Sequence, residues 1–247
     1  MSRKTVLITG GNGAIGQALC IGFKQSGWRV ISTDQGKVSV VEVDGYIPMD
    51  LKRLCSDDAY QEEVIGSLRS KLYGGGLDAL VNNAAVQIVA PVEDITIQDF
   101  KATLDINVVA PFVLVQSFLS ELQKANGSVT NIASIHAQLT KPSFTAYATS
   151  KGGLVSLTRS LAIELGSRVR VNAVCPAAID TPMLKKGFES SRQNFESLKR
   201  VHPSGCIGRP QDVVDATLFL SETEGRFLNG VILGLDGGIA SRLHEID

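Results

Sequence analysis

The sequence predicts an α/β fold: a doubly wound parallel sheet of about seven strands with helices on both faces. Two observations support this class. Short runs rich in Val and Ile alternate with longer segments of helical periodicity, and a glycine-rich turn joins the first run to the first helical segment. The runs are apolar throughout, as is typical of parallel strands buried on both faces.

The first βαβ unit is clear. A strand is expected over Thr5–Thr9, a helix over Ala14–Gln25 and a second strand over Arg29–Thr33. The next segment contains two candidate strands, Val38–Val43 and Tyr46–Met49, with no room for a normal crossover helix. We favour the second as the third parallel strand.

The same alternation continues to the C-terminus. Helices are expected over Asp57–Lys71, Ile97–Lys124, Thr145–Leu165 and Pro210–Ser221. Strands are expected over Ala79–Asn82, Ser128–Ala133, Arg170–Val174 and Val231–Leu235. No linker or repeat interrupts the pattern, so residues 1–247 are expected to form one domain with one large core.

The composition excludes several functional classes. With 44% hydrophobic and 20% charged residues and a formal net charge of −1, the chain gives no electrostatic reason for a nucleic-acid or membrane partner. No apolar stretch approaches the ~20 residues that span a bilayer, and the first apolar run is too short for a secretion signal. The three histidines and four cysteines fall in no metal-ligand spacing. We therefore expect no metal site. We expect the cysteines to be free thiols in a reducing cytoplasm.

The turn Thr9–Gly16 reads Thr-Gly-Gly-Asn-Gly-Ala-Ile-Gly. At this place an α/β fold presents backbone N–H groups and the positive end of a helix to a pyrophosphate. A merely tight turn needs one or two glycines, not four in seven residues. The cofactor contacts expected here are Gly10, Asn12, Gly13, Ala14, Ile15 and Gly16.

Asp34 follows the second strand, where a carboxylate accepts hydrogen bonds from adenosine ribose hydroxyls and repels a 2′-phosphate. This favours NAD over NADP, and the absence of a basic residue from the glycine turn favours it too. The alternatives are an ordinary turn aspartate and a role for Lys37 toward a phosphate.

Tyr147 and Lys151 lie four residues apart in a predicted helix, so both project from one face. A free phenol has a pKa of about 10, and a nearby cation lowers it. Such a pair suits proton transfer, although this spacing alone also occurs by chance.

Together these motifs resemble the short-chain dehydrogenase/reductase family over essentially the whole chain. The family's ordered motifs are matched at Thr9–Gly16, Asn82–Ala85, Asn107, Ser134, Tyr147 with Lys151, and Pro176–Thr181. The resemblance implies a single Rossmann-type domain. It also implies that Tyr147 is the acid-base catalyst, Ser134 holds the substrate oxygen, Lys151 binds the nicotinamide ribose and lowers the tyrosine pKa, and Asn107 holds a relay water.

The resemblance implies further cofactor contacts, among them adenine at Asp50 and the nicotinamide carboxamide at Thr181. The others are Leu51, Asn83, Ala84, Ala85, Tyr147, Lys151, Pro176 and Ile179. Three positions depart from the family: Ala14, Ala85 and Ala177 replace glycine. A Cβ restricts positive φ and close backbone approach, which bears on cofactor affinity.

The substrate is expected near Gln87, His136 and Phe144, beneath a lid over residues 184–206. Phe188, Phe195 and Leu198 recur in that lid at roughly helical spacing. The alternative for His136 is a loop histidine without a role. The alternative for the apolar residues of the lid segment is plain core packing.

The sequence therefore predicts an NAD-dependent oxidoreductase that interconverts a small-molecule secondary alcohol and a ketone. By resemblance it is a homo-oligomer, a tetramer or a dimer. The alternative is a catalytically idle NAD-binding module, which would have no need of all four catalytic residues. Sugar-nucleotide epimerases normally need an added substrate domain, for which this length leaves no space.

Overall fold

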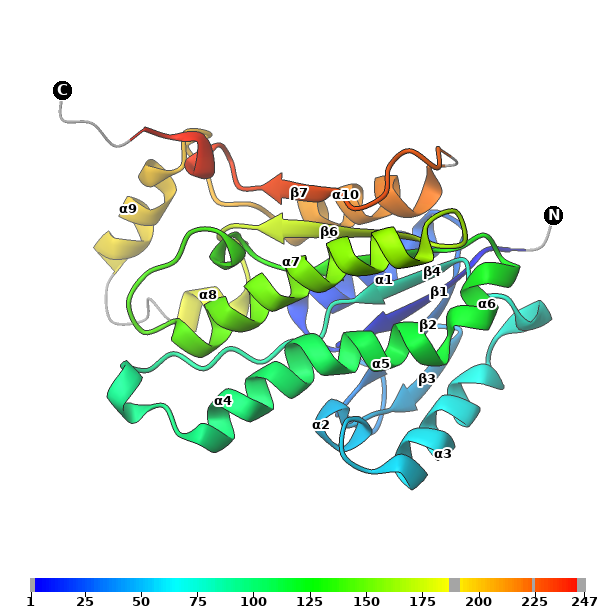
Figure 1. The fold of residues 1–247 in the computed structure, drawn as a ribbon. Helices are drawn as coiled ribbons and strands as arrows, with labels where there is room; N and C mark the ends of the chain where they lie inside the picture. Colours follow the sequence, from blue (N-terminus) through cyan, green and yellow to red (C-terminus); the bar gives the residue numbers. More distant parts are fainter. Residues whose placement is uncertain (1–2, 187–191, 224, 244–247) are drawn as a thin grey trace.

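The computed structural model describes residues 3–186, 192–223 and 225–243, which form a seven-stranded parallel sheet between two layers of helices (Figure 1). The strand order is β3-β2-β1-β4-β5-β6-β7, and all neighbouring strands are parallel. The order reverses between β1 and β4, which makes the sheet doubly wound. The predicted fold class is confirmed.

Every predicted strand is present, and each observed strand begins and ends within two residues of its predicted bounds. The strands are β1 Thr5–Thr9, β2 Arg29–Asp34, β3 Gly45–Pro48, β4 Ala79–Asn82, β5 Ser128–Ile132, β6 Arg170–Pro176 and β7 Ile232–Leu235.

The helices extend the predicted set by several short elements. They are α1 Ala14–Gln25, α2 Leu51–Leu54, α3 Asp58–Arg69, α4 Ile97–Leu104, α5 Ala110–Ser117, α6 Leu119–Lys124, α7 Thr145–Leu165, α8 Pro182–Lys186, α9 Arg192–Val201 and α10 Pro210–Glu222. The helices α1 and α7 have the predicted bounds, whereas α2 was not expected.

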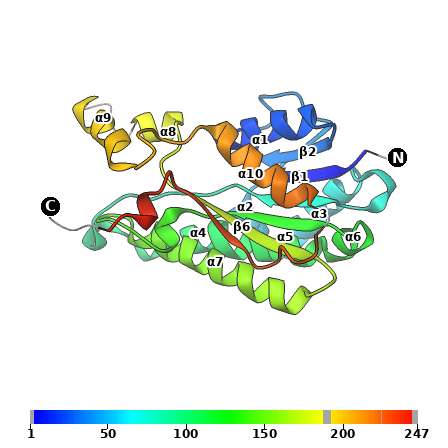
Figure 2. The ribbon, with the colours of Figure 1, turned by 90° about the horizontal axis from the view of Figure 1, so that it is seen from above.

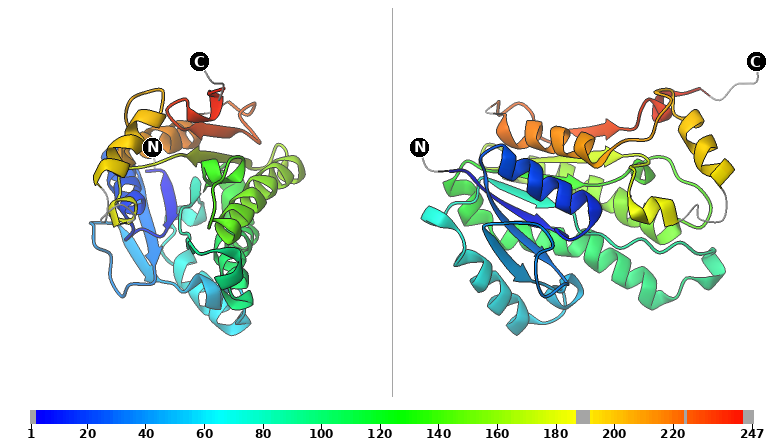
Figure 3. Two further views of the ribbon diagram at one scale, coloured as in Figure 1. Left: turned by 90° about the vertical axis from the view of Figure 1, so that its left-hand side faces the viewer. Right: turned by 180° about the vertical axis from the view of Figure 1, so that it is seen from behind.

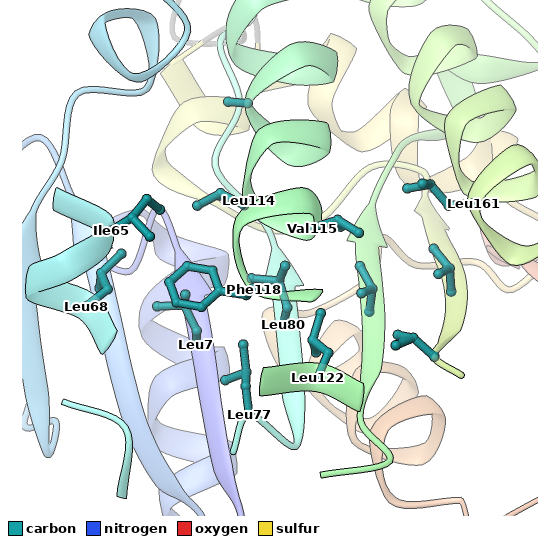
Figure 4. Packing of buried hydrophobic residues seen from close by; sticks show 14 of the residues in the cluster. Leu7, Ile65, Leu68, Leu77, Leu80, Leu114, Val115, Phe118, Leu122 and Leu161 are labelled. Atoms are coloured by element: carbon teal, nitrogen blue, oxygen red, sulfur yellow. The ribbon is translucent and has the colours of Figure 1, made fainter. Parts of the chain in front are cut away.

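The sheet is covered by α1 and α10 on one face and by α3, α5 and α7 on the other (Figures 2 and 3). Because side chains alternate along a strand, each strand supplies both layers of the core. Leu7 and Leu80 pack with α3, α5 and α7, while Val6 and Ile8 pack with α1 and α10. Phe118 lies at the centre of the first layer and is fully buried (Figure 4).

The prediction of one continuous helix over Ile97–Lys124 was wrong. The segment Asp105–Val109 is a π-helical turn between α4 and α5, in which the Ala110 N–H reaches back to the Asp105 carbonyl. Pro111 explains the interruption: it has no N–H to give to the carbonyl of Asn107, and its ring crowds that carbonyl. Proline in this pattern was the available signal.

The candidate strand Val38–Val43 is not a strand, and the preferred alternative is confirmed with a shift of one residue. We call residues 35–44 the β2–β3 connection. It contains no helix, and its Val38 and Val40 side chains are 71% and 59% exposed. The connection is anchored near its end, where the Asp44 carboxylate accepts a hydrogen bond from Val30 N at 2.9 Å.

Candidate active site

The predicted site residues gather at the carboxyl ends of the strands, around the point where the strand order reverses. In an open α/β sheet this is where ligands bind. Figure 1 shows α8 and α9 beyond the same edge of the sheet, at the left. The candidate active site therefore lies between the ends of β1, β2, β4, β5 and β6 and these helices.

The glycine turn lies directly against the end of β4. Gly10 has a φ of +67°, and a Cβ on it would lie 2.8 Å from the Ala84 Cα. Gly13 precedes α1 without giving it a side-chain cap. Backbone N–H groups of the first turn of α1 are thus available to an anion.

Asn83 fixes this turn from the neighbouring strand. Its Nδ2 donates to the carbonyl oxygens of Thr9 at 2.9 Å and Gly10 at 3.1 Å. In return, the Thr9 hydroxyl accepts from the backbone N–H of Asn83 at 3.1 Å and of Ala84 at 3.0 Å. Asn83 therefore positions the turn through its side chain; its contact with the cofactor stays a prediction.

Asp34 ends β2 beside the turn. One carboxylate oxygen accepts from Asn12 N at 3.0 Å, and the other accepts from Gln35 N at 2.8 Å. A carboxylate offers about four lone-pair sites, so both oxygens keep capacity for ribose hydroxyls. Lys37 lies nearby in the sequence and is exposed.

Asp50 and Leu51 have structural roles of their own. The Asp50 carboxylate caps α2 by accepting from Lys52 N at 2.9 Å and Arg53 N at 3.2 Å. The Leu51 side chain is buried in the core with α3 and α5. The expected adenine contacts at these positions stay predictions.

The predicted catalytic residues Tyr147, Lys151 and Ser134 come together at one place. Tyr147 and Lys151 lie one turn apart on α7, with the Lys151 Nζ 5.7 Å from the centroid of the Tyr147 ring. Ser134 follows β5, and its side chain lies close enough to the Tyr147 hydroxyl to lower the tyrosine pKa. Lys151 is 2% exposed and donates to the Ile132 carbonyl oxygen at 2.8 Å.

The pKa of Tyr147 is raised, chiefly because its hydroxyl is desolvated; the hydrogen bond with Ser134 lowers it and Cys175 raises it further. Burial lowers the pKa of Lys151 from 10.5 to about 8. From the sequence, Lys151 is expected to lower the tyrosine pKa, whereas in the structure burial is the largest influence and the net shift is upward. In this structure Tyr147 is a protonated phenol at neutral pH.

Asn107 lies buried in the π turn and ties three elements together. It exchanges hydrogen bonds with the backbone of Val86, donating to the carbonyl oxygen and accepting from the N–H at 2.9 Å each. It also donates to the Ser150 hydroxyl at 2.9 Å, which donates to the Tyr147 carbonyl oxygen. Asn107 is therefore connected to α7, and its role toward a relay water stays a prediction.

Two of the expected substrate residues form an aromatic pair beside Tyr147. The rings of His136 and Phe144 stack with centroids 4.4 Å apart and planes 2° apart. Each meets the Tyr147 ring edge-on. Burial, and then Lys141, lower the pKa of His136, so the imidazole is neutral at pH 7. Gln87 is half-buried on the segment after β4.

The alanines that replace glycine require no left-handed backbone. Ala14, Ala85 and Ala177 all lie outside the positive-φ region, which among described non-glycine residues holds Asn126 and Ser143. The concern about backbone strain is therefore removed, while the effect of the added methyl groups on cofactor affinity is a separate matter.

Pro176, the last residue of β6, is buried, and so is Ile179, which bridges to Gly208. The Thr181 hydroxyl accepts from Leu184 N at 3.2 Å and so caps α8. The expected lid contains α8 and α9, with Phe195 and Leu198 on α9. Phe188 lies outside the described residues.

Sequence reasoning missed Cys175, which is buried at the end of β6 and interacts electrostatically with both Tyr147 and Lys151. Its place just before Pro176 was the available signal. It also missed Tyr46, whose hydroxyl reaches the glycine turn at Asn12. No motif marks that residue.

The residues present fit a dinucleotide. A Cβ on Gly16 would overlap the Gly10 carbonyl oxygen, so only glycine allows this compact turn beneath the start of α1. The carboxylate of Asp34 borders the turn on one side, and the Tyr147–Lys151 pair lies along the same edge of the sheet. Fold and site together define an α/β oxidoreductase of the dinucleotide-binding class.

Comparison with known proteins places the chain within this class. Residues 11–240 match the family model described as enoyl-(acyl carrier protein) reductase. The chain is 35% identical over 248 residues to 3-oxoacyl-(acyl-carrier-protein) reductase FabG of Thermotoga maritima, which covers 97% of this chain and 98% of FabG.

Solved structures of similar fold support the same class of protein. Ligand-free aldohexose dehydrogenase (AldT) of Thermoplasma acidophilum matches with a TM-score of 0.91 and 27% identity over 99% of this chain and 97% of AldT. ElxO with NADP bound matches with a TM-score of 0.86 and 27% identity over 98% of this chain and 100% of ElxO. The chain belongs to the short-chain dehydrogenase/reductase family of oxidoreductases.

The described residues contain no group of three or more His, Cys, Asp or Glu side chains that could hold a metal ion. No described helix is both long and apolar enough to cross a membrane. The cysteines Cys20, Cys55, Cys175 and Cys206 are free thiols.

The burial of Lys151 leads to a prediction about the free energy of unfolding. Since the folded pKa of Lys151 is about 8 against 10.5 for a free lysine, folding at neutral pH costs roughly 3 kcal/mol in this group. We expect Lys151→Met to raise the free energy of unfolding at pH 7 by roughly 1 to 3 kcal/mol.

Between pH 8 and 10.5 Lys151 is largely protonated in the unfolded chain and largely deprotonated in the folded protein. The free energy of unfolding of the wild type therefore rises over this pH range. The difference between the free energies of unfolding of Lys151→Met and the wild type becomes smaller. Urea unfolding at pH 7, 9 and 10.5 measures this difference, with the exposed Lys52→Met as control. A difference that does not change with pH would contradict the prediction.

Proposed function

We propose that the protein is an NAD(H)-dependent oxidoreductase that interconverts a secondary alcohol and a ketone, with Tyr147 as the acid-base catalyst. The observation that carries the proposal is the convergence of Tyr147, Lys151 and Ser134 at the edge of the sheet that holds the glycine turn. In this chemistry the bound nicotinamide donates or accepts the hydride, and the protein handles the proton.

The protein's own part begins with the substrate oxygen. The Ser134 side chain lies beside the Tyr147 hydroxyl, so an oxygen that enters between them can accept from both hydroxyls. Because desolvation keeps the phenol protonated, Tyr147 is ready to donate its proton to a carbonyl during reduction. In oxidation the tyrosine takes the hydroxyl proton, and the buried Lys151 cation stabilises the resulting phenolate.

The stacked His136 and Phe144 rings support a substrate site with one flat aromatic wall beside Tyr147. Neutral His136 has its Nδ1 3.0 Å from the Thr140 hydroxyl, which leaves Nε2 for a polar group of the substrate. Gln87 is proposed as a further contact, and the segment 184–206 as the lid that excludes water.

Cofactor choice rests on Asp34. Its carboxylate ends β2 and keeps acceptor capacity beside the turn, which suits the two ribose hydroxyls of NAD. ElxO, a protein of similar structure, was solved with NADP. The preference of this chain for NAD is therefore our proposal and needs a direct test.

We expect the wild type to bind NADH more tightly than NADPH. Asp34→Asn should lower the ratio of the NADPH to the NADH dissociation constant by about tenfold, because it removes the charge that repels the 2′-phosphate. Fluorescence titration of both cofactors measures this ratio, with the exposed Asp94→Asn as control. Tighter binding of NADPH by the wild type would overturn the cofactor proposal.

Tyr147→Phe should lower turnover by about 10² to 10⁴-fold while NADH binding stays within about twofold. The phenyl ring keeps the packing and loses only the transferable proton. The assay follows nicotinamide absorbance with NADH and a panel of ketones that includes a 3-oxoacyl thioester and an oxidised sugar, chosen after FabG and AldT.

The same assay separates the competing function, an idle NAD-binding module. Such a module would bind NADH and turn over no member of a broad panel of alcohols and ketones. If a true substrate is found and Tyr147→Phe turns it over at the wild-type rate, the acid-base assignment is wrong.

We also propose a homo-oligomer in which α4 and α5 meet a second copy. Phe112 and Val109 lie three residues apart on one helical face and are 41% and 37% exposed, and Ile97 is 67% exposed. An exposed pair of apolar side chains on one helix face, with a third on the neighbouring helix, is typical of an interface.

Phe112→Glu should lower the molar mass measured by light scattering after gel filtration, since it buries a charge at the interface. Phe227→Glu is the matched control, because Phe227 is fully exposed and lies outside α4 and α5. A monomeric wild type would exclude the proposed oligomer.

A further inference from the structure

Asn12 links the glycine turn to the β2–β3 connection. Its Nδ2 donates to the Val38 carbonyl oxygen at 3.0 Å and to the Tyr46 hydroxyl at 3.3 Å. Its Oδ1 accepts from Val40 N at 3.0 Å. The side chain thus uses both of its donors and one acceptor on residues 26 to 34 positions away.

Tyr46 completes the link from β3. Its hydroxyl donates to the Gly36 carbonyl oxygen, and a Cβ on Gly36 would lie 2.8 Å from the Asn12 Nδ2. The connection is therefore packed directly on the turn at Gly36 and held again at Val38. Without a helix in this connection, these side-chain bonds supply partners that helical hydrogen bonds would otherwise supply.

Lys37 is the residue between these two held positions. It is exposed, and it forms no ion pair with any other residue that the structure describes. Asp34, three residues earlier, borders the turn through its bond to Asn12 N. A cation and an anion thus flank the same short stretch of backbone. Asn12 bonds to Asp34 through its backbone N–H and to Val38, the residue after Lys37, through its side chain.

We propose that Asn12 is a specificity-determining positioning residue, which holds the connection so that Asp34, and not Lys37, faces the adenosine ribose. The inference rests on the proposed binding of NAD(H) at the glycine turn. When the Asn12 bonds are lost, the backbone at Lys37 is released. The ammonium group then approaches the place of a 2′-phosphate and offsets the repulsion from Asp34.

The experiment compares the ratio of the NADPH to the NADH dissociation constant in four proteins. Asn12→Ala should lower this ratio about tenfold, as expected for the loss of the three side-chain hydrogen bonds that fix the connection. Adding Lys37→Ala to Asn12→Ala should restore most of the ratio, because the released cation is gone. The control is Ser39→Ala, since Ser39 bonds only within the connection, to Val41.

The ratio is defined whichever cofactor the wild type prefers, so this test is separate from that of Asp34. If the wild type binds neither cofactor, the proposed function fails. If Asn12→Ala binds both cofactors with a ratio within twofold of the wild type, or if Lys37→Ala does not restore a lowered ratio, the role of Asn12 is overturned.

Tyr46→Phe tests the same link from outside the glycine turn. It removes the hydroxyl that bonds Asn12 and Gly36 and leaves the turn sequence intact. The ratio should fall in the same direction, by about threefold, because Asn12 keeps its bonds to Val38 and Val40. Should thermal unfolding show that Asn12→Ala does not fold, an unchanged ratio in Tyr46→Phe overturns the proposal.

Discussion

The close contact between the glycine turn and the end of β4 is the constraint on which the site depends. Gly10 approaches Ala84 so closely that no side chain fits between them, and Asn83 and Thr9 join the two strands with four hydrogen bonds. This contact lies where the strand order reverses. It fixes the start of α1 on one side and the segment leading to Val86 on the other, so the glycine turn and the segment that bonds to Asn107 share one anchor.

The residues predicted to be catalytic are held by partners that are mostly backbone. Asn107 bonds both polar groups of the Val86 backbone, and Lys151 bonds the Ile132 carbonyl oxygen. Lys151 has no carboxylate partner among the described residues. Its lowered pKa reflects the free-energy cost of burying its charge. A cation kept there against stability is consistent with a role in chemistry rather than in folding.

Much of this could be predicted from the sequence, since apolar runs mark buried strands and the ordered motifs mark the site. The exceptions have physical causes. The π turn follows from Pro111, one residue in a segment whose periodicity otherwise indicates a single helix. The direction of the Tyr147 pKa depends on burial, which spacing does not reveal. The bonds of Asn12 and Tyr46 join residues distant in sequence, and no local pattern encodes them.

The π turn also acts as a change of phase in one long helical segment. It holds one residue more than a regular turn, so α4 and α5 present different faces to their neighbours: α4 packs on α7, and α5 packs on the sheet. The number of residues between Leu104 and Pro111 therefore matters as much as their identity. Substitutions along the exposed side leave this phase intact, whereas an insertion or deletion of one residue rotates α4 by about 100° against α5 and turns Asn107 away from Val86.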